Sequence, residues 1–280
     1  MDKKSIDGDM DRAYSPSSVA GNYLEVVAAY GERSEQTMRR LPHAIVRYGA
    51  DDDEYIVVFE PQARQPYEAM LVFFHGGYWQ ALSARDACFP AQMLTERGFA
   101  YAAVNYSLAP KAGIAIIVGQ CIEALKLLAA RAPHARLVIA GSSAGAHLAA
   151  MLMTTDWVAA RMTKAPFTAA LLISGIYDLQ PLVGTYINAP LGLDIDSARR
   201  LSPMRLPLRS PVDTVVCWGE HETDAFKQQS LGFSTALARA GAHTSMHEVG
   251  HKNHFDILFD LTDPSTRLSV DTLSLLGEKP

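Results

Sequence analysis

Short runs of β-branched and aromatic residues alternate along the chain with longer segments of helical period. The short runs predict strands at residues 44–48, 55–60, 70–74, 100–105, 137–140, 169–174, 214–218 and 243–249. Apolar positions spaced three and four residues apart predict helices over 18–38, 87–97, 116–131, 146–153 and 225–240. Such alternation is typical of βαβ units, so we expect the α/β class, with a mostly parallel central sheet of about eight strands flanked by helices.

Two segments interrupt this rhythm. Residues 1–40 precede the first strand, and we expect them to form an N-terminal helical segment packed on the body or over a site. Residues 178–211 are rich in proline and too long for a simple turn, which predicts a small cap. Because no repeat and no linker separates two halves, residues 1–280 are interpreted as a single domain with these two additions.

Composition narrows the classes of function. The 280 residues are 49% hydrophobic and 20% charged, which is usual for a folded globular protein. A formal charge of −5 and the lack of a long basic cluster argue against a nucleic-acid partner, and no apolar run is long enough to predict a membrane span. The charged N-terminus and three widely spaced cysteines, Cys88, Cys121 and Cys217, favour a reducing compartment, so we expect a cytoplasmic protein.

The strongest chemical signal lies in residues 137–151, where an apolar strand runs into Gly-Ser-Ser-Ala-Gly and then an alanine-rich helix. This is a G-x-S-x-G pattern between a strand and a helix, a context that lifts the central hydroxyl clear of the backbone. Ser143 is therefore the candidate nucleophile. The alternative, a Gly/Ser turn that only caps a helix, is disfavoured because strand, turn and helix follow in this order.

A second apolar strand ends in His75-Gly76-Gly77. Acyl transfer needs donors aimed at the oxygen that becomes negative in the tetrahedral intermediate, and glycines let backbone N–H groups approach it. We expect Gly76 and Gly77, with the N–H of Ala144, to form this oxyanion hole.

A serine nucleophile also needs a base and an orienting acid. In enzymes with this elbow the acid and then the histidine follow the serine along the chain, so the base is His251 or His254, after the last predicted strand. Spacing alone does not decide between the two histidines. For the acid, the loop after 214–218 favours Glu222, with Asp224 second; Asp178 is a weaker candidate that is better interpreted as a turn residue.

The remaining polar residues point to no cofactor. His147 lies one helical turn after Ser143 and is interpreted as a packed or hydrogen-bonded histidine. The chain shows no HExxH and no cysteine pair for a metal, and no glycine-rich phosphate loop, so neither a metal nor a nucleotide cofactor is predicted.

These motifs together resemble the kynurenine formamidases, or arylformamidases, of the α/β-hydrolase superfamily, in the branch of the hormone-sensitive-lipase-like esterases. The resemblance is carried by these segments: YSPS at 14–17, HGGYWQ at 75–80, APK at 109–111, GSSAGAHLAAM at 141–151, DW at 156–157, SGIYDLQPL at 174–182, FKQQS at 226–230 and NHFD at 253–256. It implies the α/β-hydrolase fold, with Ser143 as nucleophile, His254 as base and Glu222 as acid. It also implies Gly76, Gly77 and Ala144 as oxyanion donors.

The resemblance further implies hydrolysis of N-formyl-L-kynurenine to kynurenine and formate through an acyl-enzyme, without a cofactor. Tyr78 and Trp79 would provide aromatic walls for this substrate. The family usually has Asp where this chain has Glu222, so the longer side chain must fold back to reach the same imidazole nitrogen. The alternative is a carboxylesterase or aryl-acylamidase that acts on other small aryl amides or short-chain esters. The expected partner is thus a small molecule, and a homodimer stays open.

Overall fold

The computed structural model describes residues 8–62 and 66–278, and within them the chain builds one eight-stranded sheet. The strands lie in the order β1-β2-β4-β3-β5-β6-β7-β8. Their bounds are β1 Ala44–Arg47, β2 Tyr55–Phe59, β3 Ala69–Phe74, β4 Ala100–Val104, β5 Arg136–Ser142, β6 Phe167–Ile173, β7 Asp213–His221 and β8 Thr244–Asn253. Strand β2 is antiparallel to both β1 and β4, and every other neighbouring pair is parallel. The α/β fold with a mostly parallel sheet is confirmed.

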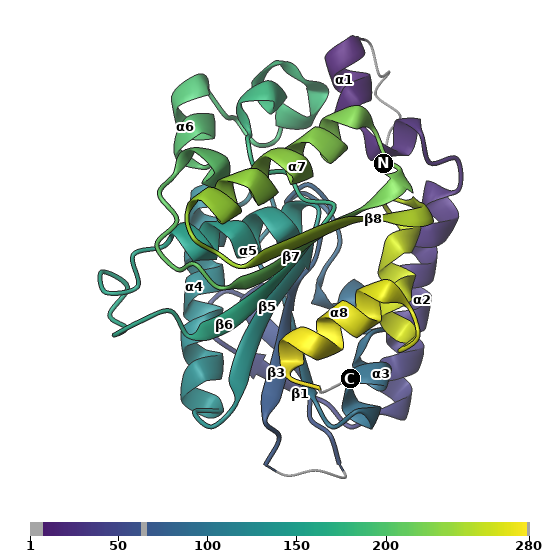
Figure 1. Cartoon of the computed structure of the whole chain (residues 1–280), viewed down its shortest axis with the longest axis vertical. Helices are drawn as coiled ribbons and strands as arrows, with labels where there is room; N and C mark the ends of the chain where they lie inside the picture. The colour runs from purple at the N-terminus through teal and green to yellow at the C-terminus, as the bar shows by residue number, and fades with distance from the viewer. Residues whose placement is uncertain (1–7, 63–65, 279–280) are drawn as a thin grey trace.

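Helices cover both faces of the sheet (Figure 1). The α-helices are α1 Asp9–Ala13, α2 Tyr23–Arg40, α3 Ala91–Glu96, α4 Ile114–Arg131, α5 Ala144–Thr154, α6 Ile195–Arg200, α7 Asp224–Arg239 and α8 Arg267–Leu276. The 3-10 helices are η1 Pro16–Ser18, η2 Ala84–Ala87, η3 Gln180–Gly184, η4 Tyr186–Asn188, η5 Pro203–Arg205 and η6 Asp256–Thr262. Helices α4, α5 and α7 lie on one face of the sheet, and α2, α3 and α8 lie on the other.

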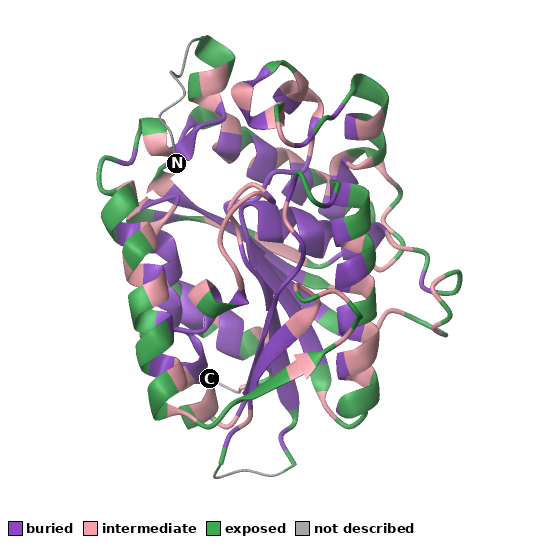
Figure 2. Cartoon of the chain, turned by 180° about the vertical axis from the view of Figure 1, so that it is seen from behind, coloured by how far each residue is buried: buried purple, intermediate pink, exposed green. Residues whose placement is uncertain are grey.

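The core consists of two apolar clusters separated by the sheet. Successive side chains of a strand point to opposite faces, so Met70, Val72 and Phe74 of β3 join the cluster under α4 and α5. Leu71 and Phe73 join the cluster under α2, α3 and α8. Figure 2 shows the inner strands buried throughout and the helices buried on the side that faces them. A strand covered on both faces has few polar positions, which is why these runs are continuously apolar in the sequence.

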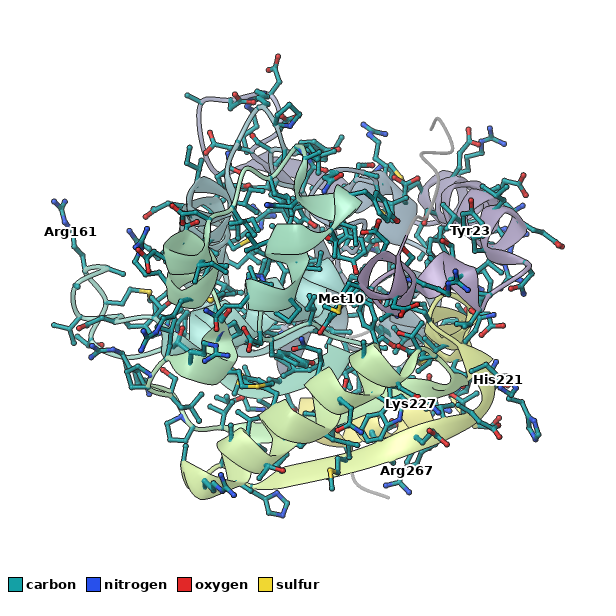
Figure 3. All side chains as sticks on the ribbon, turned by 90° about the horizontal axis from the view of Figure 1, so that it is seen from above. Met10, Tyr23, Arg161, His221, Lys227 and Arg267 are labelled. Carbon is teal, nitrogen blue, oxygen red and sulfur yellow. The ribbon has the colours of Figure 1, made fainter. Side chains whose placement is uncertain are left out.

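The carboxyl ends of β3 and β5 form the topological switch point of the sheet, where consecutive connections run to opposite sides of β3. Strand β3 lies between β4 and β5, so the connection after β4 crosses to the other side of β3. Crevices at such switch points are where open α/β sheets bind ligands. In the view from above (Figure 3), Met10 of α1 lies near the middle of this end and Tyr23 of α2 lies to one side.

The two interrupting segments are largely helical. The part of the N-terminal segment within the described residues contains α1, η1 and α2, while residues 1–7 lie outside them. Residues 178–211 contain η3, η4, α6 and η5. The role of 178–211 as a cap stays a prediction. In the described part of the chain, no helix combines the length and apolarity needed to cross a membrane.

Candidate active site

Ser143 sits at a sharp turn between β5 and α5. Its backbone lies at φ 56° and ψ −117°, a region that residues with a Cβ rarely adopt. The turn is fixed from both sides, because the Ser143 N–H donates to the carbonyl of Ile173 (2.9 Å) and the Ser143 carbonyl accepts from the N–H of His147 (3.1 Å). A strained conformation held by its surroundings is common where a side chain must be presented to a substrate.

The glycines on either side of Ser143 allow strand and helix to touch. A Cβ built on Gly145 would lie 1.9 Å from the Phe74 carbonyl oxygen, so α5 starts directly against the end of β3. A Cβ on Gly141 would lie 2.3 Å from the backbone of Gly145. Glycine is therefore required at both positions for this turn.

The backbone N–H groups of Gly76, Gly77 and Ala144 have no acceptor within the described residues. The loop after β3 passes against the serine turn, since a Cβ on Gly76 would lie 3.1 Å from the Ser142 carbonyl oxygen and 3.4 Å from Ser143 Cβ. Ala144 begins α5, where the helix dipole adds positive potential. Of the three predicted oxyanion donors, Gly76 and Ala144 adjoin Ser143, and none of the three N–H groups has an acceptor among the described residues.

His75 holds the start of the loop after β3 in place. Its Nδ1 lies 2.8 Å from the Gly76 carbonyl oxygen, which can only accept, so Nδ1 carries the hydrogen. The ring stacks on Tyr106 with centroids 4.1 Å apart, and the Tyr106 hydroxyl donates to the His75 carbonyl (2.7 Å). Burial lowers the pKa of His75 to about 4, so this histidine is neutral and structural near neutral pH.

His254 and Glu222 form a buried pair at the ends of β8 and β7. His254 Nδ1 lies 2.9 Å from Glu222 Oε2, so Nδ1 donates to the carboxylate and Nε2 is left as the free nitrogen. Neither Nε2 nor Ser143 Oγ has a hydrogen-bond partner in residues 8–62 and 66–278, and neither is fully enclosed. Both therefore reach accessible space, as a base and a nucleophile must.

The Glu222 side chain folds back toward its own strand. Its Oε1 accepts from the backbone N–H of Gly219 (2.6 Å) and from the Ser174 hydroxyl (2.5 Å). The close approach of β7 and β8 makes this fold possible, because a Cβ on Gly219 would lie 2.5 Å from the Lys252 carbonyl oxygen. The sequence reasoning missed Ser174, although it lies in the SGIYDLQPL segment, because its contact with Glu222 spans 48 residues.

The alternative triad residues have other partners. The side chain of His251 is 96% exposed, whereas that of His254 is 5% exposed. Asp224 lies in the first turn of α7, and Asp178 pairs with Arg205 (2.6 Å) and accepts from the N–H of Gln180 (3.1 Å), as a turn residue does. The interpretation of His147 is confirmed, since it is fully buried and its Nε2 donates to the Leu201 carbonyl (2.7 Å).

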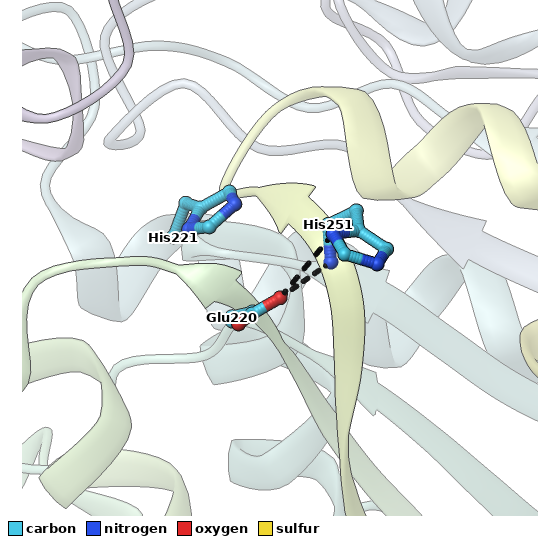
Figure 4. Close-up of side chains that lie close together, drawn as sticks. All are labelled: Glu220, His221 and His251. Carbon is cyan, nitrogen blue, oxygen red and sulfur yellow. Dashed lines mark hydrogen bonds and ion pairs between the residues drawn. The ribbon is translucent and has the colours of Figure 1, made fainter.

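His251 belongs instead to a surface group with Glu220 and His221 (Figure 4). Their ligand atoms lie within 4.8 Å of one another, an arrangement that could hold a metal ion and that no sequence motif indicated. All three are at least partly exposed, and a Glu220 oxygen already accepts from the backbone N–H of His251 (2.7 Å). The contacts between Glu220 and His251 account for this group at the rim of β7 and β8.

Aromatic rings and the N-terminal segment close the space around His254. The ring of Phe226 packs edge-on against His254, with ring centroids 4.6 Å apart. The ring of Tyr78 packs edge-on against Phe226, with centroids 6.4 Å apart. Phe226 was not among the site residues predicted from the sequence. The Tyr78 hydroxyl donates to the Tyr14 carbonyl (2.5 Å). Trp79 is fully buried, and its ring packs on His147 with centroids 4.9 Å apart, so its role as a substrate wall stays a prediction.

Comparisons with known proteins place this chain in a family. Over 99% of its length it is 33% identical to the kynurenine formamidase of Danio rerio, 99% of which is covered. The kynurenine formamidase of Salmo salar is 31% identical, with 96% of each chain covered. The chain belongs to the kynurenine formamidase family. Residues 71–257 also match the profile of a family described by its alpha/beta hydrolase fold, so this formamidase-family protein is a hydrolase.

A solved structure agrees with this assignment at the level of the backbone. A protein from Silicibacter sp. TM1040, provisionally named a thioesterase, superposes with a TM-score of 0.85 at 26% identity. The comparison covers 94% of this chain and 98% of that one. The match spans nearly the whole chain and confirms the predicted fold. The two kynurenine formamidase relatives confirm the family resemblance.

Proposed function

We propose that this protein hydrolyses N-formyl-L-kynurenine to kynurenine and formate through an acyl-enzyme on Ser143. The observation that supports the proposal most strongly is the buried His254–Glu222 pair, which lies at the same end of the sheet as Ser143. Among the described residues, His254 Nε2 and the N–H groups of Gly76, Gly77 and Ala144 have no hydrogen-bond partner. The names of the relatives from Danio rerio and Salmo salar support a formamide as the substrate class.

In the first half-reaction, Ser143 Oγ attacks the formyl carbon while His254 Nε2 accepts the hydroxyl proton. The carbonyl oxygen becomes negative, and the N–H groups of Gly76, Gly77 and Ala144 donate to it. The carbon–nitrogen bond then breaks as His254 returns the proton to the arylamine nitrogen. Kynurenine leaves, and the formyl group stays on Ser143 as an ester.

In the second half-reaction, water attacks the formyl-serine ester. His254 Nε2 takes a proton from the water, and the same three N–H groups stabilise the second oxyanion. The ester bond breaks, the proton returns to Ser143 Oγ, and formic acid leaves, which gives its remaining proton to solvent and becomes formate. The role of Glu222 is to hold the tautomer and orientation of His254 and to stabilise the imidazolium.

The proposed oxyanion donors and the aromatic residues near His254 suit a substrate with a small acyl group and an aromatic leaving group. An arylamine leaves more easily than an alkyl amine, and formyl is the smallest acyl group, so a tight oxyanion pocket suffices. Tyr78 and Phe226 supply aromatic surface beside His254. In this account residues 1–40 and 178–211 are additions to a single domain that shape the space for the rest of the substrate.

The test compares two substrates with the purified protein. Formate release and kynurenine absorbance report turnover of N-formyl-L-kynurenine, and p-nitrophenyl acetate reports ester cleavage. We expect kcat/KM for the formamide to exceed that for the ester. Ester cleavage with little formamide turnover would contradict the substrate and favour an esterase or aryl-acylamidase of the same fold.

A further inference from the structure

We propose that Ser174 is a positioning residue that holds the carboxylate of Glu222 in the orientation that His254 requires. This inference rests on the proposed role of Glu222 as the triad acid. Ser174 is fully buried just after β6, and its hydroxyl donates to Glu222 Oε1 at 2.5 Å. The opposite oxygen, Oε2, accepts from His254. One carboxylate therefore connects the serine and the imidazole.

The contact restrains a side chain that is one methylene longer than aspartate. Its additional methylene adds a rotatable bond, and freezing such a bond costs conformational entropy. Two donors from different elements, the Gly219 N–H and the Ser174 hydroxyl, both hold Oε1. With Oε1 held, the plane of the carboxylate is fixed and Oε2 stays directed at His254 Nδ1. Without the hydroxyl, the Gly219 N–H alone would hold Oε1.

Ser174 is itself held rigidly. Its backbone has φ 52°, in the left-handed region, and its N–H donates to the Cys217 carbonyl of β7 (2.8 Å). The preceding residue, Ile173, accepts the N–H of Ser143. The end of β6 thus contacts the nucleophile turn on one side and the acid on the other, in line with the strand order β5-β6-β7. A side chain on such a rigid element can align another precisely placed group.

The test measures kcat and KM separately for Ser174→Ala and Ser174→Gly, with p-nitrophenyl acetate as substrate. Glycine tolerates the positive φ, so Ser174→Gly removes the hydroxyl with less backbone strain and guards against a variant that fails to fold. A hydrogen bond to a charged group contributes enough to predict a fall in kcat of about tenfold in both variants. We expect KM to change less than about twofold, because no substrate contact is lost.

A double-mutant cycle separates positioning from general damage. Glu222→Asp shortens the acid away from Ser174, so we expect Ser174→Ala to lower kcat less than about twofold in that background. The matched control is Ser234→Ala in α7, which removes another buried serine hydroxyl, one without a partner, and should leave kcat unchanged. Wild-type kcat in both Ser174 variants would overturn the proposal. So would an equal loss from Ser174→Ala whether or not Glu222→Asp is also present.

The choice of ester keeps this test apart from the proposed substrate. A wild-type protein that cleaves the ester but not the formamide would contradict the formamide and still allow the cycle to decide on Ser174. A wild-type protein that cleaves neither would remove the triad and the positioning role together.

Discussion

At the scale of single residues, burial decides which of two neighbouring histidines, and which of two neighbouring acids, belongs to the site. His251 and His254 lie three positions apart, and both follow the run of apolar residues that predicts the last strand. The strand β8 continues to Asn253, which leaves the side chain of His251 in solvent and brings His254 against Glu222. In the same way, Glu222 directly follows the end of β7 and contacts His254, whereas Asp224 lies in the first turn of α7.

The two histidines provide a matched pair of variants. We expect His254→Ala to lower kcat by about 10⁴-fold or more, because Ser143 loses its base. His251→Ala removes only an exposed side chain beside Glu220, so kcat should stay within about twofold of wild type. Steady-state kinetics on N-formyl-L-kynurenine check both variants. Equal losses in the two would place the base elsewhere than at His254.

The acidic residues provide a second pair. Glu222→Gln keeps the shape but removes the charge that fixes the histidine tautomer, and we expect kcat to fall by about 10⁴-fold. Asp224→Asn alters the first turn of α7, which costs about 0.3–1 kcal/mol of stability and little activity. The check is kcat together with the free energy of unfolding. An Asp224 variant that is the less active of the two would reverse the assignment of the acid.

Sequence reasoning located these residues to within a few positions because Ser143, the glycines and the last histidines each follow a predicted strand. The spacing of residues does not decide whether His251 or His254 is the base, because the burial of each side chain depends on where β8 ends. Only the family resemblance favours His254. Ser174 and Phe226 were missed because their importance comes from contacts with Glu222 and His254, which are distant in the sequence. The roles themselves stay predictions.

At the scale of elements, the site depends on how closely loops and helices approach the sheet. Gly76 and Gly145 lie within a few ångströms of the same serine turn but have different neighbours. The first carries a proposed oxyanion donor, whereas the second lets α5 pack on β3. Substitution should therefore damage catalysis at one position and stability at the other.

For Gly76→Ala we expect kcat to fall by about 10²-fold, because the added Cβ pushes the loop and its N–H away from Ser143. Gly145→Ala should lower the free energy of unfolding by about 3 kcal/mol, since its Cβ meets a backbone carbonyl that cannot give way. The control is Gly119→Ala in α4, where nothing lies within 4 Å and a gain of about 0.5–1 kcal/mol is expected. Urea unfolding and kinetics on all three variants check this, and a Gly76 variant with normal kcat would argue against the donor.

The predicted elements agree with the structure where an apolar run is long and unbroken. Strands β3, β4 and β6 lie within one or two residues of their predicted ends. The helix predicted over 87–97 is instead η2 followed by α3, because Pro90 starts a new helix. Helix α8 was not predicted; it begins at a Thr266 cap and buries only one side against the second core cluster.

At the scale of the whole molecule, two buried histidines make the fold sensitive to acid. His75 and His147 are both fully buried, and desolvation lowers the pKa of each to about 4. In the unfolded chain a histidine has a pKa of about 6.5, so below that pH the unfolded state binds protons that the folded state does not. Stability is therefore complete above about pH 7 and is lost as the pH falls toward 4.

We expect each of these histidines to lower the free energy of unfolding by about 2 kcal/mol between pH 7 and pH 5. Exposed carboxylates with lowered pKa values, such as Asp51, act in the same direction but at lower pH. Urea unfolding at the two pH values measures the total for wild type and for His147→Gln, whose amide can still donate to Leu201. The variant should lose about half of the pH dependence that the two histidines supply; an unchanged dependence would contradict a neutral buried His147.

The central claim is that Ser143 carries out acyl transfer on an aryl formamide, and one measurement tests it directly. Formate and kynurenine are quantified together while wild type or Ser143→Ala acts on N-formyl-L-kynurenine, with the melting temperatures of both proteins as the check on folding. The account predicts equal amounts of the two products from wild type and a fall of about 10⁶-fold in kcat for a folded Ser143→Ala. A folded Ser143→Ala that still releases formate at the wild-type rate would contradict it.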